Sequence, residues 1–493
     1  MTRLDHSRAP VLDALADFHR RGDWVFAPPG HRQGYGVDPR VLAVMGRGAF
    51  ASDVLLMNGL DDRRTSGKIL EQAQELMADA VGAEHAFFST CGSSLSVKTA
   101  MLAVAGPGEK LLISRNAHKS VTSGVIVNGT LPVWVHPTWD PERHIAHPPE
   151  PADVRRALQE HPDAKGMLLI TPTDWGTCAD IRGVAEVCHE YGVPLIVDEA
   201  WGAHLPFHDQ LPTWGMDADA DIVVTSVHKM GMAVEQSSVF HLQGDRVDPT
   251  VLKQREDLLA TTSSSNLVYA SLDGWRRQMV EQGEHLLTEA LTRANRIRQE
   301  IGSIEGYVPM GQEVVEQGYA AEIDPLVLTI DTRGLGITGY QVAELARSEW
   351  SIDLGSADTC RVCVKITHAD DDHAEERLLR ALRGVAEMAP TLEPSGQVDL
   401  PQPGELELET VMRPRDAFFA EVEQVPVAEA VGRIAAEMVT PYPPGVPALA
   451  PGERITEAVI DYLRSGVDAG MLIPEAADPK VTSLRVVKRG AER

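Results

Sequence analysis

The chain has 493 residues, of which 43% are hydrophobic and 24% charged, a composition typical of a folded protein with more than one hydrophobic core. Its net charge of −27 argues against nucleic acid and anionic membranes as partners. No apolar run is long enough for a membrane helix, and the start MTRLDHSRAP lacks the apolar core of a signal peptide, so we expect a cytoplasmic protein.

An N-terminal segment, residues 1–60, combines an amphipathic start with the Gly- and Pro-rich loop FAPPGHRQGYG. Residues 61–300 then alternate between helix-like and strand-like stretches. The predicted strands of this part are AFFST, KLLIS, PVWV, GMLLIT, VPLIVDEA, ADIVVTS and SSVFHLQ. Because helical stretches of about ten residues separate most of these strands, we predict a large α/β domain with a mostly parallel seven-stranded sheet covered on both faces.

The rest of the chain predicts two smaller domains. A long amphipathic helix over residues 270–301 leads to a small α/β domain, 301–392, with PLVLTID and CRVCVKIT as strands. The polar, Pro-rich residues 393–404 are a predicted linker. Residues 405–493 form a predicted C-terminal α+β domain, in which we expect VAEAVGRIAAEM (427–438) to be a helix.

An acid and a lysine each follow one of the predicted strands. Asp198 ends the apolar run VPLIVD, and Lys229 comes shortly after ADIVVTS. Open α/β sheets collect their ligands at this edge. Pyridoxal phosphate (PLP) needs both residues, a lysine for the Schiff base and an acid that keeps the pyridine nitrogen protonated. A buried ion pair is the simpler explanation, so the hypothesis requires the other parts of a PLP site.

A candidate phosphate site lies in STCGSS, which follows a strand and opens a helix. Gly92 permits a tight turn, and the backbone N–H groups and hydroxyls of Ser93 and Ser94 would hold a phosphate dianion. An ordinary helix cap uses the same residue types, so the segment alone does not decide between the two. Ser226 and His228, beside the lysine in SVHK, are further candidate phosphate ligands.

Three more residues could contact the cofactor ring. His118 follows the strand KLLIS, where a flat imidazole could stack on the ring and transfer protons. Ala200 and Trp201 follow Asp198 and could line the other side of the ring. A solvated histidine and a core aromatic are the alternatives for His118 and Trp201.

We assign no metal and no disulfide framework. Cys360 and Cys363 form a lone CxxC inside a predicted strand, which gives little support for a zinc or redox site. His204 and His208 have helical ligand spacing, but Pro206 between them argues against a helix.

The order of the motifs resembles that of a known family. The motifs are FAPPGH, GLDD, AQEL, FFSTCGSS, RNAHKS, TPTDWG, VDEAWGAH, SVHK, ASLD and AVGRIAAEM-TPYPPG. With these motifs, residues 26–453 resemble the Orn/Lys/Arg decarboxylases, which are PLP enzymes of fold type I with an aspartate-aminotransferase-like fold. The chain is similar to the short form, which has no N-terminal wing domain.

The resemblance implies roles for individual residues. Lys229 matches the Schiff-base lysine, Asp198 the partner of the pyridine nitrogen and His118 the ring-stacking histidine, while Ser93, Ser94, Ser226 and His228 match phosphate-side positions. Family members share active sites between two subunits, which implies a homodimer, or a larger assembly, with Thr262 reaching the partner's cofactor. Tyr442 and Glu453 match a segment that contributes to the substrate pocket.

The sequence also departs from the family pattern at Cys91, Trp201, Glu235 and the run Ser263–Asn266. None of these changes removes a catalytic group. We therefore expect decarboxylation of a basic amino acid (arginine, lysine or ornithine), with Glu453 and Glu235 as candidates to bind the distal cation. The departures leave open a second hypothesis, in which the same fold transaminates or oxidatively deaminates a basic or specialised amino acid. A non-catalytic homologue is a third, which the intact Asp198, Lys229 and His118 argue against.

Overall fold

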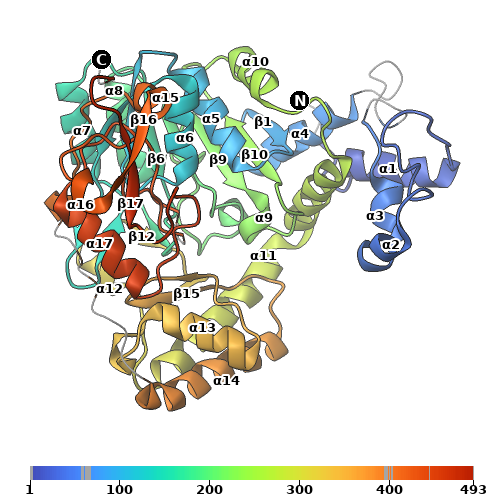
Figure 1. Ribbon diagram of the computed structural model, residues 1–493. Helices are drawn as coiled ribbons and strands as arrows, with labels where there is room; N and C mark the ends of the chain where they lie inside the picture. The colour runs from blue at the N-terminus through green and yellow to red at the C-terminus, as the bar shows by residue number, and fades with distance from the viewer. Residues whose placement is uncertain are drawn as a thin grey trace. The chain divides into compact units, whose positions relative to one another are not determined.

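The computed structural model describes residues 4–56, 60, 68–392, 398, 400, 403–442 and 445–491. The predicted linker 393–404 lies mostly outside these residues, as do the motif GLDD apart from Leu60 and the two central prolines of PYPPG. The chain divides into two compact units: the first comprises Met1–Val104 and Pro194–Leu286, and the second Ala105–Val193 and Leu287–Arg493. Figure 1 labels many of the elements of the two units.

The first unit contains four strands and several helices. Its strands are β1 (His85–Ser89), β8 (Leu195–Asp198), β9 (Ile222–Ser226) and β10 (Ser238–Leu242). Its helices are α1 (Pro10–Arg21), α2 (Pro39–Met45), α3 (Arg47–Ser52), α4 (Ile69–Ala80), α5 (Ser93–Val104), the 3-10 helix η1 (Leu205–Phe207), α9 (Val227–Met230) and α10 (Pro249–Leu259). The long helix α11 (Asn266–Gly302) begins in this unit and continues into the sequence of the second.

The strands of the first unit follow the order β1-β10-β9-β8. β10 is antiparallel to both β1 and β9, whereas β8 and β9 run parallel, with Asp198 opposite Val224. Every residue of β8 and β9 is buried. Continuous burial explains why both read as uninterrupted apolar runs, because a strand covered on both faces has no polar side. Helix α5 packs along β9 and β10 (Figure 1).

The second unit contains a parallel run of strands and several smaller sheets. The parallel strands are β2 (Lys110–Ser114), β3 (Leu131–Val135) and β6 (Met167–Ile170), with β2 paired to both others. The smaller pairings join β4 (Thr138–Asp140) to β5 (Ile145–His147), β7 (Thr177–Cys178) to β12 (Glu322–Ile323), and β16 (Val422–Pro426) to β17 (Ser483–Val487). A further antiparallel sheet has the order β11 (Val308–Pro309), β13 (Val327–Asp331), β15 (Arg361–Lys365) and β14 (Ser356–Ala357).

Several helices of the second unit begin at a capping side chain. The helices of this unit are α6 (Lys119–Asn128), α7 (Pro151–Glu160), α8 (Ile181–Glu190), α12 (Glu313–Glu316), α13 (Gly339–Trp350), α14 (Asp372–Met388), α15 (Pro414–Phe419), α16 (Val427–Ala430), α17 (Glu457–Asp468) and the 3-10 helices η2 (Arg333–Leu335), η3 (Ala389–Thr391) and η4 (Pro403–Leu406). Thr338 caps α13 by accepting a hydrogen bond from the backbone of Gln341, whose side chain accepts in return from the backbone of Thr338. Asp371 caps α14 with a single bond, in which its carboxylate accepts from the backbone N–H of Ala374. Helices α13 and α14 lie side by side near β15 in Figure 1.

One predicted helix is wrong. VAEAVGRIAAEM is helical only over α16, and the chain after Ala430 forms a turn and isolated β-bridges. Gly432 lies in the turn with φ +77, a left-handed conformation that ends a helix. The apolar residues Ala435 and Val439 nevertheless pack into the core around α17, so burial alone produced the helix-like pattern.

All seven predicted strands of the large α/β part are present, four in the first unit and three in the second. Residues 266–302 form the predicted long helix, which begins four residues earlier than we expected. No helix within the described residues combines the length and the apolarity needed to cross a bilayer.

Candidate functional site

The predicted acid and lysine lie at the same strand edge of the first unit. Asp198 is the last residue of β8 and only 5% exposed, and Lys229 lies in α9, the short helix that directly follows β9. Because β8 and β9 are parallel, their carboxyl ends meet at one edge. The Nζ atom of Lys229 is 4.2 Å from the centre of the Trp201 ring, so Trp201 forms a wall beside the amine.

The predicted phosphate residues of the first unit also come together. Ser226, the last residue of β9, donates a hydrogen bond from Oγ to Oγ of Ser93, 2.6 Å away, at the start of α5. Gly92, the residue before Ser93, has φ +75, and a Cβ atom built on Gly92 would meet no other atom within 4 Å. Ser94 is exposed at the same helix end. The positive end of a twelve-residue helix, two hydroxyls and open space suit a phosphate dianion.

His228 is oriented by the segment that follows the lysine. Its Nδ1 donates to the carbonyl of Ser237 over 2.9 Å, and its Nε2 lies 3.8 Å from Oε1 of Glu235. The Glu235 side chain is 88% exposed. Glu235 is therefore a solvent-facing partner of His228 in this unit.

The remaining predicted residues of the first unit occupy two loops. Ala200 lies just after β8, where its carbonyl accepts a hydrogen bond from the backbone of Ser226 over 3.3 Å. Thr262 is exposed in the loop between α10 and α11. At the end of that loop, Asn266 is buried and donates from its side-chain amide to the carbonyl of Val54. The departure at position 266 thus anchors the loop to the N-terminal segment.

His118 and Tyr442 belong to the second unit. His118 caps α6, where its Nδ1 accepts from the backbone of Ser120 over 3.2 Å. The next residue, Lys119, donates its backbone N–H to the carbonyl of Gly445 over 2.8 Å, and its ammonium lies 5.0 Å from the ring centre of Tyr442. Tyr442 and Gly445 therefore lie beside the start of α6, which His118 caps.

The structure gives Glu453 a different partner from the expected substrate cation. Glu453 is 1% exposed, and its two carboxylate oxygens accept hydrogen bonds from Arg115 over 3.1 and 3.2 Å. The backbone N–H of Ala450 donates to it over 2.7 Å. Within the second unit, its charge is thus already balanced by a guanidinium.

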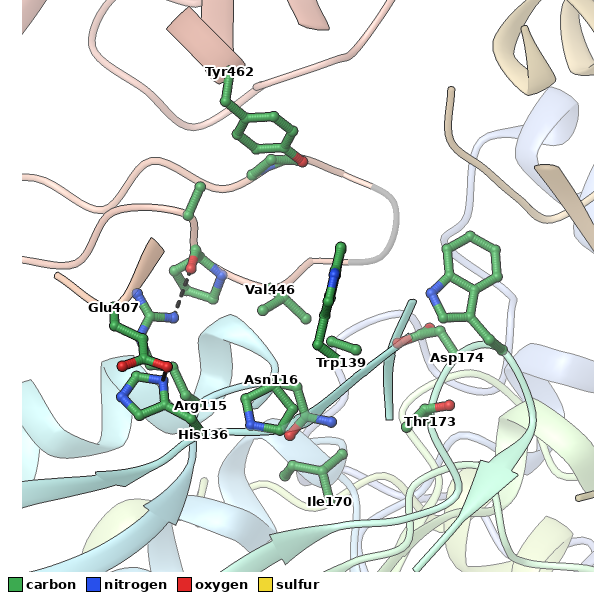
Figure 2. Close-up of a pocket in the computed structure, with 16 residues that line it drawn as sticks. Arg115, Asn116, His136, Trp139, Ile170, Thr173, Asp174, Glu407, Val446 and Tyr462 are labelled. Atoms are coloured by element: carbon green, nitrogen blue, oxygen red, sulfur yellow. Dashed lines mark hydrogen bonds and ion pairs between the residues drawn. The ribbon is translucent and has the colours of Figure 1, made fainter. Parts of the chain in front are cut away.

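A cavity of about 260 Å3 lies in the second unit at the carboxyl ends of β2, β3 and β6 (Figure 2). Trp139, Trp175 and Tyr462 are its aromatic residues, and Asp174 and Glu407 its carboxylates. The sequence analysis did not predict this cavity as a site. Three motifs nevertheless supply residues to its lining: RNAHKS with Arg115 and Asn116, TPTDWG with Asp174 and Trp175, and TPYPPG with Pro441.

His136 is the titratable imidazole of this cavity. Burial lowers the pKa of His136, and Arg115 lowers it further, although Glu407 and Glu453 oppose both effects. A histidine with such a pKa is neutral at neutral pH. His136 therefore adds no positive charge to the cavity.

The sequence of this chain is similar to that of a known enzyme family over most of its length. Residues 9–344 match the family model described as Orn/Lys/Arg decarboxylase, major domain, and residues 404–475 match Orn/Lys/Arg decarboxylase, C-terminal domain. An arginine decarboxylase of Bacillus subtilis is 38% identical, covering 98% of this chain and 99% of that protein. The constitutive lysine decarboxylase of Escherichia coli is 25% identical, covering 96% and 79%.

A solved lysine decarboxylase of Francisella novicida aligns with a TM-score of 0.81 at 20% identity, covering 97% of this chain and 81% of that one. The predicted fold type, an α/β PLP-enzyme fold with a smaller α/β part and a C-terminal α+β part, is thereby confirmed.

Proposed function

Since this chain belongs to the Orn/Lys/Arg decarboxylase family and is a decarboxylase of basic amino acids, we propose that its substrate is arginine, its product agmatine and its cofactor PLP. The observation that carries arginine is the 38% identity to an arginine decarboxylase over nearly the full length of both chains. The lysine decarboxylase of Escherichia coli is only 25% identical.

The residues of the first unit fit the proposed cofactor. PLP needs a phosphate cradle, an amine and a carboxylate on one scaffold. The start of α5 supplies open space at Gly92 and the bonded hydroxyls of Ser93 and Ser226. Asp198 and Lys229 follow adjacent parallel strands, with Trp201 beside the amine. An ordinary ion pair between Asp198 and Lys229 would explain neither the open phosphate cradle at the start of α5 nor the position of Trp201.

Each of these residues has a task in the proposed reaction. When bound, PLP supplies a protonated ring that accepts the electron pair left behind as CO2 departs. Lys229 would hold the cofactor through Nζ. Asp198, buried at the end of β8, would pair with the ring nitrogen and so favour the protonated ring. Lys229 or His118 then returns a proton to Cα.

The other proposed roles rest on the family resemblance together with local geometry. His228 and Ser94 would complete the phosphate cradle, and Ala200 would contact the ring. We also propose a homodimer in which Thr262, exposed in its loop, contacts the partner's cofactor. Tyr442 and Glu235 remain candidates for substrate contact, and the cytoplasmic location stays a prediction. For Glu453 we propose a supporting role through Arg115.

A substrate screen tests this proposal. Purified enzyme with PLP is incubated separately with arginine, lysine and ornithine, and the products are identified by mass. We expect agmatine and CO2 from arginine at a rate well above those from the other two. Release of a diamine from lysine or ornithine alone would contradict the substrate assignment. A product that retains the carboxylate would contradict the reaction and favour transamination or oxidative deamination.

A further inference from the structure

We propose that the cavity of the second unit binds the guanidinium end of the substrate, against the tryptophan rings and the carboxylates of Asp174 and Glu407 that line it. This inference rests on the proposed function and adds the residues that would select arginine. Trp139 and Trp175 both line the cavity. In Figure 2, Asp174 and Thr173 lie on one side of the cavity and Glu407 lies on the other.

Both tryptophans contact residues that lie outside the cavity lining. His144 meets Trp139 edge-on, with ring centroids 6.0 Å apart. The guanidinium of Arg361 lies 5.3 Å from the ring centre of Trp175, and Thr329 donates to the Trp175 carbonyl over 3.0 Å. Side chains fixed in this way lose little conformational entropy when a ligand binds against them.

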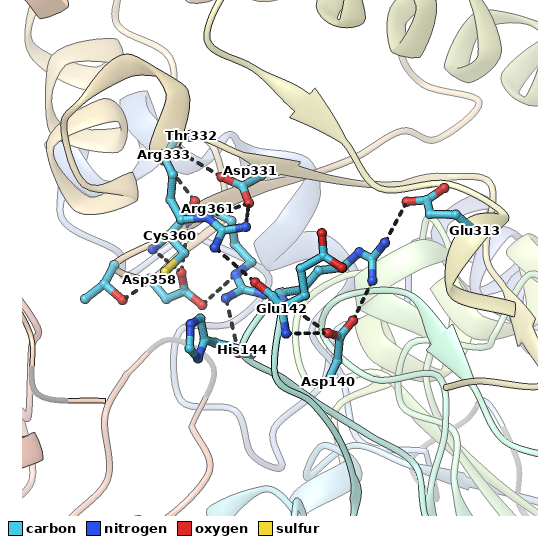
Figure 3. Close-up of polar contacts among 12 residues, drawn as sticks. Asp140, Glu142, His144, Glu313, Asp331, Thr332, Arg333, Asp358, Cys360 and Arg361 are labelled. Carbon is cyan, nitrogen blue, oxygen red and sulfur yellow. Dashed lines mark hydrogen bonds and ion pairs between the residues drawn. The ribbon is translucent and has the colours of Figure 1, made fainter. Parts of the chain in front are cut away.

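His144 and Arg361 belong to the ion-pair network drawn in Figure 3. Arg361 is 3% exposed, lies 2.9 Å from Asp358 and donates to the carbonyl of His144 over 3.2 Å. Arg143 is paired with the fully buried Asp140 over 2.7 Å. This network joins the β4–β5 hairpin, which carries Trp139, to the sheet of β13 and β15. Contacts outside the cavity lining therefore hold both tryptophans in place.

The charges that line the cavity favour a cation. Asp174 and Glu407 contribute two carboxylates, and the Glu407 side chain is half exposed, 4.0 Å from His136. Arg115 is the arginine of the lining, but Glu453 balances its charge and the carbonyl of Pro447 accepts from its other nitrogen over 2.8 Å. With His136 neutral, the lining carries a net negative charge.

The shape and chemistry of the walls favour a guanidinium over an ammonium. A guanidinium is planar, stacks on aromatic faces and offers several N–H donors in one plane, whereas an ammonium is a compact, strongly hydrated point charge. Ile170 and Val446 provide apolar surface for a methylene chain. Burial raises the pKa of Tyr462 to about 12, so its hydroxyl stays neutral and can both donate and accept.

Binding of propylguanidinium to the holoenzyme tests the proposal, because this probe has no primary amine that could react with the cofactor. Affinity is measured by calorimetry, with trimethylpropylammonium as the non-planar cation. We expect propylguanidinium to bind at least about tenfold more tightly and to inhibit competitively, since a planar cation gains stacking and directed hydrogen bonds.

Two variants locate the binding site. Trp139→Leu and Glu407→Gln should each weaken propylguanidinium binding by about tenfold. Glu405→Gln, which changes an exposed residue outside the cavity lining, should leave it unchanged. Glu407 is half exposed, so its variant keeps the fold even if Trp139→Leu does not. Unchanged affinity in Glu407→Gln, or equal affinity for the two cations, would overturn the proposal. Because the probe binds without turnover, this result is independent of which amino acid is decarboxylated.

Discussion

The strand edge of the first unit and the cavity of the second use different side chains for different tasks. The edge has small polar groups and one acid–lysine set: Ser93 and Ser226 in mutual contact, a buried Asp198 and a half-buried Lys229. The cavity has tryptophan walls with carboxylates beside them. The first arrangement suits bond breaking on a cofactor, and the second suits selection of a side chain. We therefore expect substitutions in the two regions to separate kcat from KM.

Asp198→Asn gives the largest expected effect. The amide keeps the size of the carboxylate but removes the negative charge that favours a protonated ring, so kcat should fall on the order of a hundredfold to a thousandfold. KM for arginine should change little. Steady-state CO2 release measures both parameters, and Asp209→Asn, at an exposed position, is the matched control. A change confined to KM would break the proposed separation between the two regions.

His147 should give the second unit a pH-dependent stability. His147 is fully buried in β5, stacked on Tyr319 at 5.7 Å and 3.8 Å from Asp140. Burial lowers the pKa of His147 to about 4, with smaller contributions from Arg143 and Arg361, although Asp140 opposes the shift. Between pH 6.5 and about 4 the unfolded chain binds a proton that the folded chain does not, so stability falls as the pH falls through this window.

The loss should amount to roughly 3 kcal/mol across the window. Urea unfolding at several pH values, followed by tryptophan fluorescence, measures it. His147→Gln should flatten this part of the pH dependence, because glutamine does not titrate. An unchanged slope in the variant would assign the effect to other groups.

Ser226→Ala tests whether the phosphate cradle of the first unit contributes to cofactor binding and not to the rate of the reaction. The substitution removes the hydroxyl bonded to Ser93 and one predicted phosphate ligand, so the Kd for PLP should rise about tenfold. At saturating PLP, kcat should stay near that of the parent enzyme. Absorbance titration of the apoenzyme measures the Kd, with Ser263→Ala in the exposed loop as control. An unaltered Kd would remove Ser226 from the proposed cradle.

The two regions also differ in how far the sequence could predict them. Asp198 and Lys229 were predictable because Asp198 ends one apolar strand and Lys229 comes shortly after the next, and parallel strands bring their ends together. The cavity was not, because its walls come from segments as distant as Asn116 and Tyr462. Their proximity depends on tertiary packing that no local pattern encodes.

Two further differences have the same cause. The sequence made Glu453, with Glu235, a candidate to bind the substrate cation, and it gave no sign that Glu453 has a cationic neighbour in the fold. The structure supplies that neighbour, Arg115, which lies 338 positions away. Likewise, the apolar spacing around Gly432 predicted a helix, but these residues are buried through turns and bridges. The spacing of apolar residues along the chain cannot distinguish a buried helix from buried turns and bridges.

Reductive trapping of the cofactor is the most direct test of the central claim, that Lys229 holds PLP. The holoenzyme is reduced with borohydride and digested, and the pyridoxyl-modified peptide is located by mass spectrometry. The account predicts the label on Lys229, its loss in Lys229→Ala together with decarboxylation, and its retention in Lys253→Ala, where the lysine is paired with Asp257. A label on another lysine of the parent enzyme, or none after added PLP, would contradict the account.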